Sequence, residues 1–334
     1  MADYINIRGQ SIEVVASDPA NPTVGQIWYN STSNTLKANN VTTVGAWATG
    51  GNMNTARYLL GGVGIQTAAL AFGGSPGTGP VGATEEYNGS TWASNPTGLN
   101  TARTAIGEAG TQTAGLAFGG NPGTGAVGAT EEYDGSTWTS NPTGLNTSRY
   151  YIGCSGTQTA ALGFGGYTYP PPVAYSATEE YDGSTWTTSP GSLNTTRFAL
   201  KGSGTQTATV AFGGVATGTA TGATEEYNGS TWTSSGSLNT ARYNTGDAGV
   251  QTAALAFGGE APGGKLAATE EYNGTSWTTN PVSMNTTRQG LGGAGTQTAA
   301  LGFGGDVGGS PFTTAATEEW TGAGSPNTVT ITAS

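Results

Sequence analysis

Short runs of apolar and β-branched residues alternate along most of this chain with clusters of glycine, proline and asparagine. None of these runs keeps the 3.6-residue spacing of an amphipathic helix over a useful length, so the pattern predicts strands. In the first clear unit we place four strands, at residues 58–63, 66–72, 83–87 and 90–94. Asn88-Gly89 separates the last two, and this dipeptide favours the tight turn of a β-hairpin.

The same unit recurs along the chain. The tripeptide Phe-Gly-Gly occurs six times, at intervals of 45 to 48 residues. Each copy follows Gly-x-Gln-Thr-Ala and precedes Ala-Thr-Glu-Glu-Tyr, with Trp320 in place of the tyrosine in the last copy. An Asn/Asp-Gly turn, a tryptophan and Asn-Thr-x-Arg follow. Four antiparallel strands recurring at about 46 residues are typical of a β-propeller blade.

The sixth unit is incomplete, because no tryptophan strand follows Glu319-Trp320. Trp47, however, stands ten residues before Arg57, which matches the spacing of 10 or 11 residues in the other units. We therefore predict that the strand around Trp47 completes the last blade, whose other three strands lie at residues 289–320. The predicted fold is an all-β, six-bladed β-propeller with four antiparallel strands per blade, closed by this N-terminal strand.

The order of these features resembles the kelch repeat: an apolar run into Gly-Gly, then Glu-x-Tyr, a tryptophan, and an arginine that opens the next unit. The resemblance covers residues 45–320. The chain departs from the kelch pattern in its two-residue turn and in having no histidine after the arginine. The resemblance implies a six- or seven-bladed fold that serves more often as a binding scaffold than as an enzyme.

Composition excludes several kinds of site. The chain has 10 Lys and Arg against 21 Asp and Glu, a net charge of −11, one cysteine and no histidine. Nucleic acid is not an expected partner, because affinity for phosphates requires clustered basic residues. Without histidine there is no imidazole catalyst or histidine-bearing metal site, and one cysteine forms no internal disulfide. We expect no metal, no cofactor, no membrane insertion and no cleaved secretory signal.

The six Glu-Glu pairs hold 12 of the 21 acids and raise the question of catalysis. Adjacent strand residues point to opposite faces, so the two carboxylates of one pair cannot share a substrate. We expect one glutamate per repeat to face a neighbouring blade and pair with the arginine of Asn-Thr-x-Arg. This structural ladder would comprise Arg57, Arg103, Arg149, Arg197, Arg242 and Arg288 with Glu85, Glu131, Glu179, Glu225, Glu270 and Glu318. A hydrolase would need one carboxylate pair unlike its copies, and no pair differs, so a non-enzyme is favoured.

Other motifs have structural explanations. The Asp/Asn-Gly-Ser-Thr-Trp runs resemble the Asp-box of sialidase propellers but are one residue short, and an Asp-box is itself a turn device. A copper site like that of galactose oxidase would need histidine. Phosphate-binding glycine loops need a following helix, and none is predicted.

Comparison of the six copies identifies the positions that vary. The connections between the second and third strands differ, at residues 75–82, 121–128, 167–176, 215–222, 260–267 and 306–315. Variable loops on a rigid scaffold are common recognition sites, although neutral drift is an alternative. The binding candidates are Tyr167, Tyr169, Tyr175, Lys265 and Phe312. First-strand positions also vary, and we expect Tyr151, Cys154, Lys201, Asn244 and Asp247 to line or cap a central channel.

The two ends lie outside the repeats. Residues 18–37 read as a turn and a β-hairpin, and Gly25-Gln26-Ile27-Trp28-Tyr29-Asn30 resembles hairpins of bacteriophage tail and fibre proteins. Residues 327–332 predict a strand that either adds to another subunit's sheet or packs on the N-terminal piece. The candidate assembly contacts are Ile27, Trp28, Tyr29, Val329 and Ile331. The expected organisation is an attachment segment (1–43), a propeller (44–320) and a C-terminal strand or tail (321–334).

These expectations favour a non-enzymatic structural protein of a bacteriophage virion, in a tail, a fibre or a capsid decoration. Its partners would be other virion proteins, bound through the N-terminal segment and the C-terminal strand, and a glycan on the host surface. The alternative is a free, lectin-like propeller that binds carbohydrate.

Overall fold

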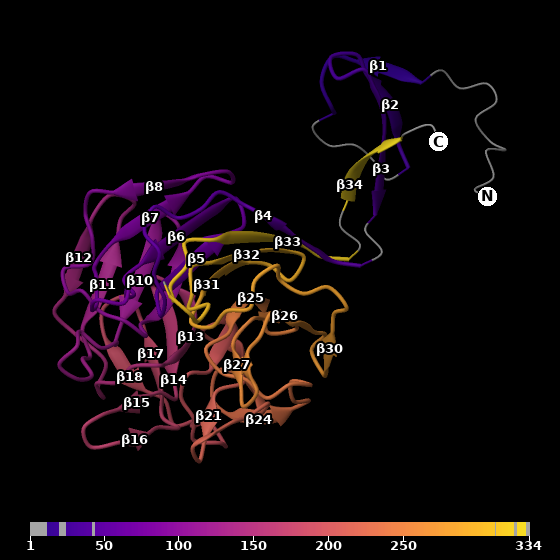
Figure 1. Ribbon diagram of the computed structural model, residues 1–334. Helices are drawn as coiled ribbons and strands as arrows, with labels where there is room; N and C mark the ends of the chain where they lie inside the picture. The colour runs from indigo at the N-terminus through magenta and orange to yellow at the C-terminus, as the bar shows by residue number, and fades with distance from the viewer. Residues whose placement is uncertain (1–11, 20–24, 42–43, 311, 324–325, 332–334) are drawn as a thin grey trace. The chain divides into compact units, whose positions relative to one another are not determined.

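The computed structural model describes residues 12–19, 25–41, 44–310, 312–323 and 326–331. These residues form strands and connecting segments, with no helix among them, so the fold class is all-β. The described part of the chain accordingly offers no helix of a length and apolarity that would cross a membrane. Two compact units are present: Met1–Gly45 with Gly322–Ser334, and Ala46–Thr321 (Figure 1).

The first unit is one four-stranded sheet built from both chain ends. Its strands, in spatial order, are β1 (Glu13–Val15), β2 (Ile27–Asn30), β3 (Thr35–Val41) and β34 (Pro326–Ile331). β1 runs parallel to β2, and the other two pairings are antiparallel. Of the two alternatives for the C-terminal strand, the structure has the one in which it packs on the N-terminal piece.

The second unit contains six four-stranded antiparallel sheets. Their strands, in spatial order within each sheet, are β5 (Gly61–Ile65), β6 (Ala68–Phe72), β7 (Thr84–Tyr87) and β8 (Trp92–Asn95); β9 (Gly107–Thr111), β10 (Ala114–Phe118), β11 (Thr130–Tyr133) and β12 (Trp138–Asn141); β13 (Gly153–Thr157), β14 (Ala160–Phe164), β17 (Thr178–Tyr181) and β18 (Trp186–Thr188); β19 (Lys201–Thr205), β20 (Ala208–Phe212), β23 (Thr224–Tyr227) and β24 (Trp232–Ser235); β25 (Gly246–Val250), β26 (Ala253–Phe257), β29 (Thr269–Tyr272) and β30 (Trp277–Thr279); and β31 (Gly292–Gly295), β32 (Ala299–Phe303), β33 (Thr317–Thr321) and β4 (Ala46–Thr49). Such repeated sheets are consistent with a β-propeller-like fold.

Three of the connections between second and third strands form small two-stranded sheets. They are β15 (Tyr167–Thr168) with β16 (Val173–Ala174), β21 (Val215–Ala216) with β22 (Thr219–Ala220), and β27 (Glu260–Ala261) with β28 (Gly264–Lys265).

The sheet that ends the repeats takes its fourth strand from the N-terminal side. β4 pairs antiparallel with β33, with Trp47 opposite Trp320 and Thr49 opposite Glu318. The two indole rings lie 5.4 Å apart, and Trp47 also packs on Phe257 at 5.0 Å. The pairing therefore places the strand around Trp47 beside the strand that carries Glu318-Glu319.

The predicted bounds of all four strands of the first unit differ from those in the structure, and the second and third strands begin at Ala68 and Thr84 rather than at residues 66 and 83. The first strand begins at Gly61 rather than at residue 58, because Leu59 adopts a left-handed conformation with φ of 52° that interrupts an extended chain. The fourth strand begins at Trp92 rather than at residue 90. Ser90 and Thr91 instead donate their N–H groups to the Asn88 side chain, at 3.0 and 2.9 Å, and stay in the turn.

The first strands of the sheets contact one another in a cycle. β5 contacts β9, β9 contacts β13, and the contacts continue through β19, β25 and β31 back to β5. In Figure 1 the labels of β5, β13, β25 and β31 accordingly lie toward the middle of the second unit.

The core lies between neighbouring sheets. Phe72 of one sheet packs on Trp138 of the next at 4.9 Å, and Phe303 packs on Trp92 at 4.8 Å. Burying an aromatic side chain contributes roughly 2 to 3 kcal/mol, so packing between sheets supplies much of the stability of this disulfide-free chain.

Candidate functional site

Each of the six four-stranded sheets of the second unit has a buried arginine–glutamate ion pair at an equivalent position. We call these six pairs the invariant frame. Arg57 Nη1 lies 2.9 Å from Glu85 Oε1, and both side chains are at most 1% exposed. The equivalent pairs are Arg103–Glu131, Arg149–Glu179, Arg197–Glu225, Arg242–Glu270 and Arg288–Glu318. All six arginine–glutamate pairs expected from the sequence are therefore present.

Each pair fixes the loop that leads into its own sheet. Arg103 also donates to the carbonyl oxygens of Gly119 and Ala129, at 2.8 and 2.6 Å. Glu131 Oε2 accepts the N–H of Asn100 at 2.6 Å. The expectation that this glutamate faces a neighbouring blade is wrong, because Arg103 and Glu131 belong to one repeat.

In five of the six Glu-Glu pairs the second glutamate makes a contact with the neighbouring sheet. Tyr227 donates its hydroxyl to Glu180 of the preceding repeat at 2.6 Å, and Tyr133 donates likewise to Glu86. In the sixth repeat Trp320 replaces this tyrosine and donates its Nε1–H to Gln297 instead. The two carboxylates of a pair thus point to opposite faces and are each held by separate partners, an arrangement unlike a catalytic pair.

A ring of backbone hydrogen bonds surrounds the space between the first strands. The residue two positions after each arginine donates its N–H to the carbonyl oxygen of its counterpart in the preceding repeat, and Leu59 donates to Gly290, so the series returns to its start. Its members are Leu59, Ala105, Tyr151, Ala199, Asn244 and Gly290, with distances of 2.7 to 3.0 Å. All six have positive φ, between 50° and 60°. Five are not glycine, and such strain is common where a binding surface is built.

The positions beside this ring differ among the repeats although their backbone is alike. The residue directly after each arginine forms an isolated bridge to the residue after Phe-Gly-Gly. The six bridged pairs are Tyr58/Ser75, Thr104/Asn121, Tyr150/Tyr167, Phe198/Val215, Tyr243/Glu260 and Gln289/Asp306. We call these twelve residues and the six ring residues the variable face.

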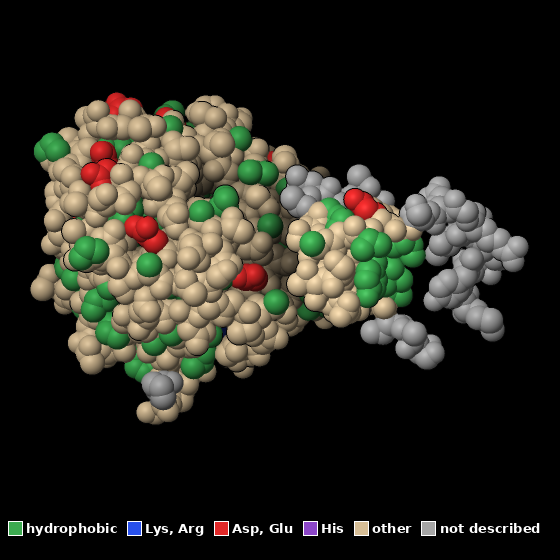
Figure 2. All heavy atoms as spheres, turned by 90° about the horizontal axis from the view of Figure 1, so that it is seen from above, with side chains coloured by type: hydrophobic (Ala, Val, Ile, Leu, Met, Phe, Trp, Pro, Cys, Tyr) green, Lys and Arg blue, Asp and Glu red, His purple; other side chains and the backbone are tan. Residues whose placement is uncertain are grey.

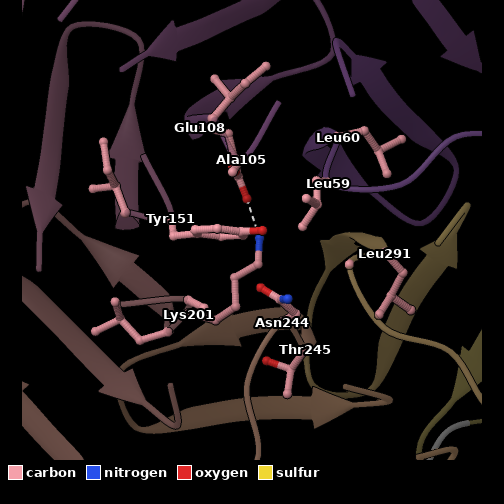
Figure 3. Close-up of a pocket in the computed structure, with 14 residues that line it drawn as sticks. Leu59, Leu60, Ala105, Glu108, Tyr151, Lys201, Asn244, Thr245 and Leu291 are labelled. Atoms are coloured by element: carbon pink, nitrogen blue, oxygen red, sulfur yellow. Dashed lines mark hydrogen bonds and ion pairs between the residues drawn. The ribbon is translucent and has the colours of Figure 1, made fainter. Parts of the chain in front are cut away.

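A small pocket lies at the centre of the variable face. It measures about 40 Å³, and all six repeats line it. The Tyr151 ring, the Lys201 chain and the Asn244 amide reach toward its centre, among aliphatic side chains such as Leu59 and Leu291 (Figure 3). Burial raises the pKa of Tyr151 to about 12, with smaller contributions from Tyr58, Tyr150 and Tyr243.

Aromatic rings continue outward from this pocket. Tyr151 lies 5.2 Å from Tyr150 and 6.2 Å from Phe198, and Tyr167 packs on Phe198 at 4.6 Å. On the other side an amide contact, Asn244 Nδ2 to Gln289 Oε1 at 2.9 Å, extends the face. The variable face therefore combines an aromatic side and an amide side.

A second cavity, of about 120 Å³, lies between the middles of the six first strands. A polar cluster borders it: Lys201 pairs with Glu108 and lies 3.5 Å from Asp247, and the Glu108 N–H donates to the Cys154 sulfur at 3.3 Å. Burial raises the pKa of Glu108 and of Asp247. Burial lowers the pKa of Lys201, but the charges of the two carboxylates outweigh it and raise that pKa above its ordinary value.

The residues predicted to line or cap a channel, Tyr151, Cys154, Lys201, Asn244 and Asp247, all border one of these two cavities. Glu108, which borders both cavities, was not among the predicted site residues. Neither were the aromatic residues Tyr58, Tyr150, Phe198 and Tyr243. These four directly follow the invariant arginines, at a position that holds tyrosine, threonine, phenylalanine or glutamine in the six copies, and that variation would have found them.

The loop candidates lie at different depths. Tyr169 is 57% exposed, whereas Tyr167 and Tyr175 are half-buried. Phe312 packs edge-on against Tyr58 at 5.5 Å, and Lys265 lies 3.4 Å from Asp306. Tyr167 therefore belongs to the variable face, and Phe312 and Lys265 contact members of it.

The terminal sheet carries an apolar row across all four strands. Val14, Tyr29, Leu36 and Ile331 are paired in register and so share one face. Val14 is 66% exposed and Ile331 is 36% exposed. Figure 2 shows hydrophobic side chains gathered on this unit.

The charged side chains among the described residues of this unit lie on the opposite face. Glu13 and Lys37 flank Trp28 there, and Lys37 pairs with Asp18 at 2.6 Å. Trp28 is fully buried and donates to Asp18 at 3.0 Å, so the prediction that it is an assembly contact is wrong. Ile27 lies on the apolar face, while the side chain of Val329 lies outside what the structure describes.

The described lysine and arginine side chains are all engaged with carboxylates: six arginines in the invariant frame, and Lys37, Lys201 and Lys265 in the pairs given above. Arg8 lies outside the described residues. Within that part of the chain no group of three or more acidic or cysteine side chains is placed to hold a metal ion.

Comparison with known proteins gives no assignment, since no protein-family model matches the chain and no curated protein is significantly similar to it.

Proposed function

We propose that residues 46–321 form a closed, six-bladed, kelch-like β-propeller in which β4 completes the last blade. Three observations support this proposal. The first strands contact one another in a cycle, the backbone hydrogen bonds from Leu59 to Gly290 return to their start, and all six repeats line each axial cavity. A closed propeller leaves only short sheet edges exposed.

The function that we propose is that of a non-enzymatic structural protein of a bacteriophage particle. The terminal sheet is the attachment unit, joined to other virion proteins, and the propeller is the displayed scaffold. The apolar row of Val14, Tyr29, Leu36 and Ile331 carries this proposal, because an exposed apolar face on a small sheet marks a protein interaction surface. Residues 25–30 resemble hairpins of bacteriophage tail and fibre proteins, and this resemblance favours a bacteriophage particle.

Mass spectrometry of purified particles tests this function, and absence of the chain from them would reject it. A sharper test compares Val14→Asp with Thr330→Asp, which place the same charge on opposite faces of the terminal sheet. We expect Val14→Asp to reduce incorporation into particles at least tenfold and Thr330→Asp to leave it near the parent level. Equal incorporation of the two variants would contradict attachment through the apolar face.

A free lectin-like propeller is the second candidate. The aromatic and amide groups of the variable face favour it, since few precisely placed polar groups among aromatic rings suit a small-molecule site. Binding of carbohydrate by a chain that is absent from particles would support the lectin over the virion protein.

A further inference from the structure

We propose that the variable face binds a neutral glycan at the axial pocket, with Tyr151 and Asn244 as its central contacts. This inference rests on the proposed function, because it identifies the ligand that the displayed propeller would take. It differs from recognition through the loop tip at Tyr169.

The invariant frame is the same in every repeat, whereas the side chains of the variable face are not. The arginine of each repeat is identical and at most 1% exposed, whereas the next two positions hold four and five residue types, respectively, on an unchanged backbone. The hydrogen-bonded ring keeps its positive φ at leucine, alanine, tyrosine and asparagine alike, so its backbone does not depend on which side chain stands there. A rigid backbone that presents different side chains is the arrangement of a recognition surface.

The side chains of the variable face include groups that suit a sugar. Aromatic rings carry a negative π face that attracts the weakly positive C–H groups of a sugar ring. The partly exposed rings of Tyr151, Tyr167 and Phe198 offer such faces, and the Asn244 and Gln289 amides both donate and accept hydrogen bonds as hydroxyl groups do. Aromatic and amide groups on facing sides of one pocket suit a ligand with an apolar face and a hydroxyl edge.

The charged residues at the variable face bear on the charge of the ligand. An acidic glycan, a phosphate or an acidic peptide needs an unpaired cation, yet Lys265 is paired with Asp306 beside this face and Lys201 with Glu108 at the pocket floor. The face also carries Glu260, which repels anions. These charges therefore disfavour an anionic ligand, and the uncharged aromatic and amide contacts suit a neutral one.

The size of the pocket sets the manner of binding. A volume of about 40 Å³ admits a substituent, such as a hydroxymethyl or acetyl group, but not a sugar ring. The ring would rest on the aromatic side of the variable face while the substituent enters between Tyr151 and Asn244.

The repeats themselves supply substitutions that preserve the fold. Ala105 and Ala199 occupy the place of Tyr151 in their own repeats, with φ of 50° and 55°. Tyr151→Ala and Asn244→Ala therefore put alanine where the chain already accommodates it. Tyr169→Ala is the matched control, because Tyr169 is exposed in a variable loop and does not line the pocket.

The test applies the full-length protein and these variants to an array of neutral, sialylated and sulfated oligosaccharides, with titration of any bound probe. We expect a neutral oligosaccharide to bind, Tyr151→Ala and Asn244→Ala each to weaken it at least tenfold at an unchanged unfolding midpoint, and Tyr169→Ala to change it less than twofold. Binding of acidic probes only, of no probe, or of a neutral probe equally well by the pocket variants would overturn the inference. Since incorporation into particles is measured separately, failure of this inference would leave the structural role standing.

Discussion

The buried arginine–glutamate pairs are the residues on which the variable face depends. Removing a charge pair from water is costly, and good geometry with further hydrogen bonds offsets that cost. Arg103 has both, since it bonds Glu131 and two or more backbone carbonyl oxygens. Burial disfavours the charged guanidinium and lowers the pKa of Arg103, whereas Glu131 opposes that shift. The pair therefore serves chiefly to hold the loop that precedes Thr104 and Ala105.

Replacement of one partner of such a pair should be severe. We expect Arg103→Met to lower the free energy of unfolding by about 3 to 5 kcal/mol, because it leaves the Glu131 carboxylate buried without its cation. Urea denaturation measures this change. Lys265→Met is the control, since its pair with Asp306 is partly exposed and its loss should cost no more than about 1 kcal/mol. A similar decrease in the free energy of unfolding of the two variants would argue against a structural role for the invariant frame.

The cluster around Lys201 predicts a dependence on pH. Burial raises the pKa of Glu108 and of Asp247 in the folded protein, so each carboxyl group binds its proton more tightly when folded than when unfolded. Their contribution to stability is therefore present below the ordinary carboxyl pKa and is lost as the pH rises through the folded pKa. Lys201 opposes this loss, because its charge favours both carboxylates.

We accordingly expect the stability of Lys201→Met relative to the parent to fall as the pH rises from 4 to 8, and the variant to be less stable than the parent by about 3 kcal/mol at pH 8. Thermal unfolding across this range checks the prediction. Parallel stability curves for parent and variant would show that the cluster does not titrate as described.

At the scale of elements, the Gly-Gly after each second strand sets how closely a sheet approaches the next loop. Gly119 has φ of 62°, and a Cβ there would lie 2.5 Å from Ile152 Cδ1 and 2.6 Å from the Arg149 oxygen. The first glycine of the pair is therefore needed for two reasons: its φ is positive, and a side chain would collide with the neighbouring loop.

Gly119→Ala should thus destabilise the protein by at least about 2 kcal/mol, from left-handed strain and overpacking together. Gly263→Ala is the matched control, because its Cβ would meet nothing within 4 Å and its φ is not positive. Urea unfolding midpoints compare the two, and a Gly119→Ala midpoint no lower than that of Gly263→Ala would count against this account of the motif.

The sequence predicts elements well where a repeated motif carries a local signal. Asn88-Gly89 marks a hairpin turn, and Trp47 reveals its strand because its distance from Arg57 matches the other copies. The sequence does not show where the first strand begins. Leu59 interrupts the strand at positive φ, and a hydrogen bond to Gly290, which is distant in sequence, holds it there. The pairing of β34 with β3 was left open for the same reason, since strand pairing is a long-range choice.

At the scale of the whole molecule, the candidate site arises from six residues of five types that occupy one backbone position in the six repeats. Comparison of the copies found Tyr151 and Asn244, but it gave no means to see that Phe198 lies beside Tyr151. Residues of different repeats lie close together because the first strands are arranged in a cycle. The sequence alone does not show which side chains this arrangement brings into contact. The variable face exists only if that cycle closes within one chain.

A disulfide between β4 and β33 tests this closure most directly. Ala46 and Thr321 are paired in register, and the native Cys154 is buried and will not compete. In the double variant Ala46→Cys/Thr321→Cys, mild oxidation followed by proteolysis and mass spectrometry should find the two peptides joined within a single chain. Cross-linking solely between two chains, or none, would show that β4 does not complete its own chain's last sheet and would contradict the closed propeller.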